Sequence, residues 1–213
     1  MPKTLPKPKP SAQSARPSRN ATPANDRCVK DRLLDAANRL FYAEGIEQVG
    51  IERILQEAGA AKASLYQHYG SKAELVKRYL ESRAELTRRA LAELLGWPGI
   101  APRDRLLLLF DFAVEHASRK DYRGCPFQNA SRELTDPAHP AVAVVCAQHA
   151  WLKAAVGAVV AEAPALAQMP QLAEALVTLY DGALISAQMQ QSPGPCHAAR
   201  WAAEQLLAGA EGR

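Results

Sequence analysis

Aromatic residues are scarce in this 213-residue sequence, at 6% of the chain. No segment alternates apolar and polar residues at the two-residue period of a half-buried strand. Alanine and leucine dominate the 48% apolar content, and these residues favour helices over sheets. A chain of this length can bury one large core or two small ones. We therefore expect an all-α protein.

Long apolar runs are absent as well. The longest, around residues 141–147 and 154–161, are far shorter than the ~18 residues of a membrane span. No apolar segment of a secretory signal follows the basic N-terminus. The chain contains no Cys-x-x-Cys pair, so we expect a cytoplasmic protein with four free thiols and no contact with a membrane. The thiols are those of Cys28, Cys125, Cys146 and Cys196.

Positive charge is concentrated at the N-terminus. The whole chain has a formal net charge of +4, whereas residues 1–30 alone carry +6 and the remainder −2. Six of the 15 prolines fall within residues 1–25. This composition predicts a disordered basic leader over residues 1–25. The leader either contacts a polyanion or is simply solvated.

Apolar residues three and four apart predict four helices between residues 26 and 95. The first begins near Asp26, a candidate N-cap, and the others cover about 51–58, 62–69 and 72–95. Ser71 precedes the fourth helix with the Ser-x-x-Glu spacing of a capping box. Glycines and prolines then mark a boundary. We expect a helix-turn-helix domain over 26–80, whose last helix runs to about 95, and a ligand-binding and dimerisation domain over 96–213.

The second domain shows helical spacing near residues 106–120, 142–159 and 172–187, and in a last helix that carries Trp201. The last two helices are apolar on more than one face, which is typical of helices that pack on their own domain and on a second copy. We expect a four-helix dimer interface there, with Trp201 as a candidate anchor. The alternative for Trp201 is a contact within its own chain.

Residues 51–72 carry the pattern that points to function. Two short helices joined by a turn at Gly59 predict a helix-turn-helix, in which the second helix enters the major groove of DNA. Leu65 and Tyr69 would hold that helix on its domain. Its other side chains, together with Lys72, offer contacts for bases and phosphates. These candidate DNA-binding residues are Lys62, Ala63, Ser64, Tyr66, Gln67, His68 and Lys72.

Different side chains in this set suit different contacts. Gln67 can bond an adenine edge, and Ala63 can touch a thymine methyl group. Lys62, Tyr66 and His68 can reach phosphates, which gives affinity and register without sequence information. Ordinary helical bundles also contain such short helices, so the spacing alone leaves a solvated surface as the alternative.

Three motifs follow one another in residues 32–79: Leu34-x-Ala36-Ala37-x-x-Leu40-Phe41-x-x-x-Gly45, Ile54-x-x-Glu57-Ala58-Gly59, and Lys62-Ala63-Ser64-Leu65-Tyr66-x-His68-Tyr69-x-Ser71-Lys72-x-Glu74-Leu75. With these motifs the segment resembles the N-terminal domain of the tetracycline-repressor (TetR) family of regulators. The resemblance implies a homodimer that binds a palindromic operator in double-stranded DNA, and a small-molecule effector that relieves repression. Ala61 and Gly50 depart from the family pattern, because Ser or Thr often caps the helices that follow them, and Ala63 replaces a common Gly.

Large side chains on the C-terminal helices are candidates for an apolar effector pocket, although plain core packing is the alternative for most of them. Cys125 is either an inert thiol or a redox sensor. Cys146 and His149 supply only two ligands, so we expect no metal site and no cofactor. The candidate pocket residues are Phe110, Val114, Phe127, Trp151, Tyr180 and Leu184.

Enzymatic motifs are missing. The chain has no G-x-S-x-G, H-E-x-x-H, phosphate-binding or dinucleotide-binding signature, so we do not expect an enzyme. A helical ligand-binding or adaptor dimer that lacks sequence-specific DNA reading is the alternative to a regulator. A helical enzyme is a third possibility.

Overall fold

The computed structural model describes residues 23–211, and the side chains of residues 29–210. Every regular element in this part of the chain is a helix, which confirms the predicted all-α class. The predicted leader lies outside the described residues. The helices are α1 (Pro23–Glu44), α2 (Ile51–Ala58), α3 (Lys62–Tyr69), α4 (Lys72–Leu95), α5 (Pro102–Ala117), α6 (Pro126–Glu133), α7 (Val142–Ala161), α8 (Pro164–Ala167), α9 (Leu172–Gln190) and α10 (Gly194–Glu211).

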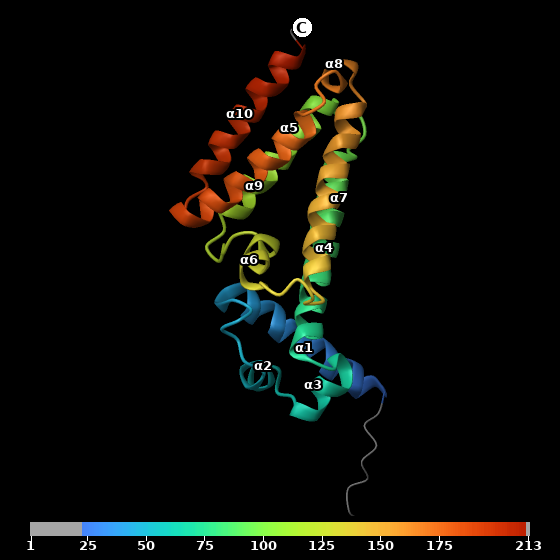
Figure 1. The fold of residues 1–213 in the computed structure, drawn as a ribbon, viewed down its shortest axis with the longest axis vertical. Helices are drawn as coiled ribbons and strands as arrows, with labels where there is room; N and C mark the ends of the chain where they lie inside the picture. Colours follow the sequence, from blue (N-terminus) through green and yellow to red (C-terminus); the bar gives the residue numbers. More distant parts are fainter. Residues whose placement is uncertain (1–22, 212–213) are drawn as a thin grey trace, which may run out of the picture.

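Helices α1 to α3 and the first half of α4 form one end of an elongated molecule (Figure 1). Leu33, Phe41, Ile54 and Tyr79 are among the buried residues of their shared core. Gly59 ends α2 in the left-handed conformation at φ 57°, which a residue without Cβ adopts at little cost. The Ser71 hydroxyl accepts a hydrogen bond from the Glu74 amide at 3.1 Å, so the predicted N-cap of α4 is present.

Helices α1, α8 and α10 have features that the sequence did not predict. Helix α1 begins at Pro23, before Asp26, because a proline suits the first turn of a helix, where its missing N–H is not needed. Gly194 is the first residue of α10, so the Pro-Gly-Pro sequence after α9 also starts the next helix. Helix α8 was not predicted, since four residues are too few to show a period.

The other end of the molecule contains α5, α7, α8, α9 and α10, with α4 running into it from the first end (Figure 1). Its core includes Phe110, Val156, Leu176 and Leu207, all of them fully or nearly fully buried. Arg105 is also buried here, and its guanidinium group donates to the Leu95 carbonyl at 2.8 Å and pairs with Glu162. A buried cation with these partners joins the end of α4 to the end of α7.

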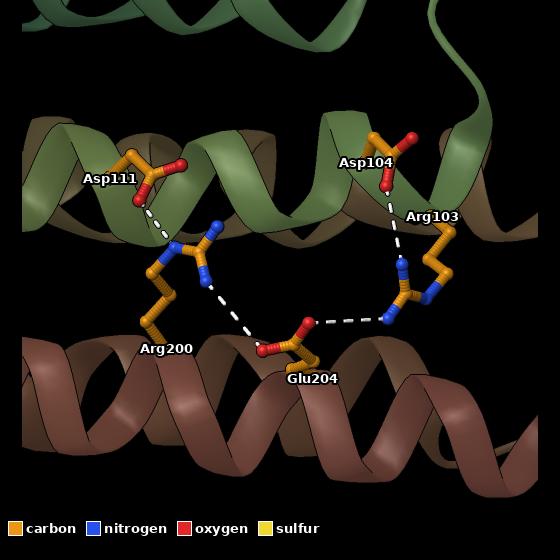
Figure 2. Close-up of polar contacts among 5 residues, drawn as sticks. All are labelled: Arg103, Asp104, Asp111, Arg200 and Glu204. Atoms are coloured by element: carbon orange, nitrogen blue, oxygen red, sulfur yellow. Dashed lines mark hydrogen bonds and ion pairs between the residues drawn. The ribbon is translucent and has the colours of Figure 1, made fainter.

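A chain of ion pairs joins α10 to α5 (Figure 2). Arg200 on α10 pairs with Asp111 on α5, and also with Glu204 at 3.7 Å. Glu204 pairs in turn with Arg103 on α5, at 3.5 Å. These contacts, together with the buried Ala199 and Ala203, fix which side of α10 faces its own domain.

Helix α6 belongs to both ends of the molecule. It follows the α5–α6 connection in sequence, yet its buried residues Phe127 and Ala130 pack in the core formed by α1 to α4, as do Leu134 and Ala141 beyond it. The N-terminal core is therefore completed by residues that lie far beyond residue 95 in the sequence. No single domain boundary in the sequence therefore separates the residues of the two cores.

Helix α7 has the length and composition of a membrane-spanning helix, with 20 residues and a mean hydropathy of 1.5. Among the described residues it is the one helix that meets this criterion, and 22% of its apolar window is buried within the chain. One such helix is weak evidence for a membrane span, because core helices also meet the criterion. No uninterrupted apolar run in α7 approaches the length of a span, since Gln148 and Lys153 break it. Within the chain, α7 packs on α4, α6 and α9.

We predict that Ser71→Ala lowers the free energy of unfolding by about 1 kcal/mol, because the Glu74 amide loses its acceptor. Chemical denaturation followed by circular dichroism measures the change. Ser118→Ala is the control, since the exposed Ser118 hydroxyl bonds the Val114 carbonyl within a helical turn and caps no N-terminus. Equal losses in the two variants would contradict the assigned role of Ser71.

Candidate DNA-binding surface and ligand cavity

Helix α3, which was predicted to read DNA, is held against its domain by the buried residues on its inner side. Leu65 and Tyr69 are buried on α3, as the four-residue spacing predicted. The Tyr69 hydroxyl donates to the Lys30 carbonyl of α1 at 2.8 Å. Burial raises the pKa of this tyrosine to about 12, so the hydroxyl keeps its proton at neutral pH. Helix α3 is thus held in a defined orientation against α1.

The turn before α3 is held by Arg32, a residue of α1. The Arg32 Nε donates to the Ala58 carbonyl at 3.0 Å, and its guanidinium group also reaches the Gly59 carbonyl. These carbonyls lie at the C-terminal end of α2, where a cation is stabilised by the helix dipole. Sequence reasoning did not single out Arg32, because only the packing of α1 on α2 brings it there.

The outer side of α3 is polar and accessible. Tyr66 is 45% exposed, Lys62, Ala63 and Gln67 are exposed, and Ser64 and His68 are half-buried. Lys72 lies half-buried in the first turn of α4. The seven candidate residues thus lie on one short helix and at the start of the next, in a form that the major groove admits.

Lys62 is tied to the helix that braces α3. Its Nζ lies 3.1 Å from the Glu52 carboxylate on α2, and both side chains are exposed. This contact raises the pKa of Lys62. The pKa of Glu52 is lowered first by a hydrogen bond from its own backbone amide and then by Lys62. The ten-residue separation gives no sign of this pair in the sequence. A phosphate that Lys62 contacts would compete with Glu52.

The two departures from the family pattern at helix starts are visible in the structure. Gly50 and Ala61 precede α2 and α3 in extended conformations, and neither helix receives a side-chain capping bond. With Ala61 before it, α3 therefore lacks the stabilisation of about 1 kcal/mol that a Ser or Thr cap contributes, whereas Gly50 costs α2 only about a few tenths of that amount.

A cavity of about 830 Å³ lies among α4, α5, α6, α7 and α9. Its size is within the range of small-molecule sites, and more of its wall is apolar than polar. Of the six pocket candidates, Phe127, Tyr180 and Leu184 line it. Phe110 lies in the core beneath it, where its ring contacts Tyr180 edge-on.

The remaining two pocket candidates also lie outside the cavity wall. Val114 and Trp151 are half-buried and pack against the core. Arg88 lies over the Trp151 ring at 5.7 Å, while its Nε donates to Gln148. Helical spacing alone could not distinguish residues of the cavity wall from residues of the core, because both kinds of residue are apolar and face inward.

The polar part of the cavity wall was not predicted. Gln128 on α6 donates to the Asp181 carboxylate on α9 at 3.0 Å, and His149 on α7 contacts the same carboxylate at 3.1 Å. Burial raises the pKa of Asp181, and the contacts with His149 and Gln128 oppose that rise. His116 also lines the cavity, and burial lowers its pKa.

The three cysteines whose side chains are described are free thiols. Cys125 lies in the cavity wall, where burial raises its pKa to about 11. Cys146 is exposed at the cavity, and Cys196 is buried. Among the described residues, no group of three His, Cys, Asp or Glu side chains is arranged to hold a metal ion.

Trp201 lies in a shallow apolar groove between α9 and α10. Its side chain is 64% exposed, and Leu179 and Leu206 line the same groove. The groove is on the side of α10 that the ion pairs with α5 leave open. The structure shows no intrachain contact that buries this indole.

Taken together, the helix-turn-helix at one end and the helical domain with its cavity have the architecture of a DNA-binding transcriptional regulator. The family model for bacterial regulatory proteins of the tetR family matches residues 33–79, and the model for the tetracycline repressor-like C-terminal domain matches residues 102–203. The chain belongs to the tetR family, whose members are DNA-binding transcriptional regulators.

Individual relatives agree with this assignment. A TetR-family regulator of Streptomyces coelicolor is 30% identical, with a TM-score of 0.78 over 86% of this chain and 96% of that one. The regulator LmrA of Bacillus subtilis is 34% identical over 112 residues, which are 52% of this chain and 60% of LmrA. An uncharacterised HTH-type transcriptional regulator in the lacX 3′ region of Lactococcus lactis is 28% identical over 112 residues, 52% of this chain and 57% of its own length. These two alignments thus span less than two thirds of each relative.

We predict that iodoacetamide at pH 8 modifies Cys146 at least roughly tenfold faster than Cys125, because the thiolate is the reacting species. With a pKa of about 11, roughly one Cys125 thiol in a thousand is ionised at pH 8. The Cys125 rate should rise about tenfold per pH unit up to that pKa. Peptide mass spectrometry of quenched samples measures both rates. A Cys125 rate equal to that of Cys146 would support a sensor role for Cys125 instead.

Proposed function

We propose that the chain is a homodimeric repressor that binds a palindromic operator in the cytoplasm and leaves it when a small molecule occupies the 830 Å³ cavity. One observation carries the proposal: α6 lines this cavity and is also part of the core that holds the helix-turn-helix. A ligand that changes the position of α6 therefore acts on the DNA-binding end.

Two specific contacts strengthen this connection. The Glu133 carboxylate at the end of α6 accepts a hydrogen bond from the Glu47 amide, in the α1–α2 connection, at 2.9 Å. The Tyr42 hydroxyl of α1 donates to the Gly124 carbonyl just before α6, at 3.2 Å, and accepts from the Arg123 amide. Tyr42 itself lines the cavity. Helix α4 supplies a second route, since it lines the cavity and begins at the DNA-binding surface.

The DNA-binding surface is that of the seven candidate residues. Gln67 and Ala63 face the bases, and Lys62, Tyr66, His68 and Lys72 face phosphates. The exposed outer side of α3 supports this assignment.

Dimerisation through α9 and α10 is supported by the exposed Trp201 and Leu206. A dimer must present its two copies of α3 about 34 Å apart to engage two half-sites in successive major grooves. A ligand that binds more tightly to a dimer with another separation shifts the population away from DNA. This is the proposed basis of release.

The decisive experiment measures binding of the full chain to DNA from upstream of its own gene, at several salt concentrations, with scrambled DNA as competitor. A complex that resists the competitor supports the regulator and provides a footprint for the half-sites. Equally weak, salt-sensitive binding to both DNAs, repeated with a genome-wide selection of fragments, would favour an adaptor dimer.

We predict that Tyr66→Ala and Lys72→Ala each weaken operator binding, and that Lys72→Ala reduces the slope of log K against log salt by about 1, because one phosphate contact is lost. Fluorescence anisotropy at four salt concentrations measures both quantities. Lys120→Ala is the control, because Lys120 is an exposed lysine just beyond the C-terminus of α5. Wild-type affinity in both test variants would refute the assigned contacts.

We also predict that Trp201→Glu increases the monomer fraction, because a carboxylate replaces the apolar centre of the proposed interface. Analytical ultracentrifugation over a range of protein concentrations measures the dissociation constant, which should rise by at least roughly a hundredfold for a hot-spot residue. Tyr66→Ala, at the DNA-binding end, should keep the wild-type value. An unchanged dimer in Trp201→Glu would exclude the groove as its centre.

A further inference from the structure

The Glu52 carboxylate contacts the start of two helices. Its Oε1 lies 3.1 Å from the Nζ of Lys62, which is the first residue of α3. The carboxylate also accepts a hydrogen bond from the Glu52 amide, in the first turn of α2. Its Oε2 lies 3.9 Å from the position that a Cβ at Gly50 would take. The carboxylate therefore lies at the start of α2 and beside the start of α3.

The start of α2 has amides that need acceptors. The first N–H groups of a helix have no acceptor within the helix, and the side chain of the preceding residue commonly supplies one. Gly50 precedes α2 and has no side chain. Here the Glu52 carboxylate accepts from one of these amides, from within the first turn. Its negative charge is also favoured there by the helix dipole.

The two donors held by Glu52 are of the kinds that DNA phosphates accept from, because lysine ammonium groups and amides at helix starts both bind phosphate. In a helix-turn-helix the first helix crosses the DNA backbone, and the second helix places its N-terminal residues in the groove. Helices α2 and α3 take these two roles in the proposed complex. The Glu52 and Lys62 side chains are 76% and 60% exposed, so a bound duplex can reach both.

We propose that Glu52 competes with the DNA backbone: its carboxylate holds Lys62 and an amide of α2 until a phosphate displaces it. This inference rests on the proposed DNA-binding function and assigns Glu52 a role in setting its affinity. Phosphate contacts carry no sequence information, so Glu52 lowers the affinity for operator and for other DNA by similar factors. The displaced carboxylate takes up a cation while Lys62 releases one from the DNA, so Glu52 also lowers the salt dependence of binding.

The variant Glu52→Gln keeps the size of the side chain and removes its charge. We expect the full chain with this change to bind the operator and a scrambled duplex about twofold to tenfold more tightly. The slope of log K against log salt should become steeper by up to about 1. Fluorescence anisotropy, starting at low salt, measures both quantities. Unchanged or weaker binding would overturn the proposal, and so would a gain confined to the operator.

A double-mutant cycle with Lys62→Ala tests whether Glu52 acts through Lys62. If the two anions compete, Lys62 of the wild-type must leave Glu52 before it contacts a phosphate. Lys62→Ala should then cost less affinity in the wild-type than in the Glu52→Gln background, by about twofold to fivefold, the range for an exposed ion pair. A larger loss in the wild-type would mean that Glu52 orients Lys62 toward DNA. That outcome, or equal losses, would contradict the competition.

Glu57→Gln is the matched control. It removes an exposed carboxylate near the other end of α2, where Glu57 pairs with Arg39 at the same distance of 3.1 Å. We expect a smaller gain in affinity than for Glu52→Gln and no coupling to Lys62→Ala. If Glu57→Gln gave the same gain and the same coupling, the effect would be one of overall charge, and the role of Glu52 would be refuted.

The two DNAs separate this inference from the proposed function, because the scrambled duplex reports phosphate contacts alone. Operator preference in every variant without coupling between Glu52 and Lys62 overturns the role of Glu52 and leaves the repressor standing. Coupling on both DNAs without operator preference retains the role of Glu52 and contradicts the sequence-specific repressor. Coupling together with operator preference supports both.

Discussion

The packing of Phe127 is the contact on which the two ends of the molecule depend. The side chain is 7% exposed, lies in the core of α1 to α4, and forms part of the cavity wall. Close-packed interiors transmit displacement because they contain few voids to absorb it. A ligand beside Phe127 therefore cannot move α6 without disturbing the core that positions α3. Both the fold of the DNA-binding end and its proposed regulation follow from this one position.

Hydrogen bonds at the two ends of α6 direct that displacement. At its start, Gln128 is bonded to Asp181, which lies on a helix of the proposed dimer interface. At its end, Glu133 is bonded to the Glu47 amide next to the helix-turn-helix. The two bonding residues are about one and a half helical turns apart along α6. The two hydrogen bonds of α6 thus link the cavity to the proposed dimer interface and to the proposed DNA-binding surface.

Spacing in the sequence was sufficient for the short helices that end at a glycine. Helices α2 and α3 were predicted to the residue, because Gly59 and Gly70 end them and Leu65 and Tyr69 mark an inner side. The start of α10 and the existence of α8 were missed, since prolines within a first turn resemble a loop in sequence. Pocket residues were predicted only in part. Phe127, Tyr180 and Leu184 reach the cavity, whereas Phe110 faces the core.

The order of amino acids was enough to predict an all-α chain, the helix-turn-helix and its family, because each depends on periods, turns and caps within about fifty residues. Contacts between residues far apart in sequence depended on how the helices pack. Contacts of this kind are the Arg32 bond to the end of α2, the Glu52–Lys62 pair, the position of α6 in the N-terminal core and the Gln128–Asp181 bond. A sequence period shows which side of a helix is apolar, but it does not show which other helix covers that side.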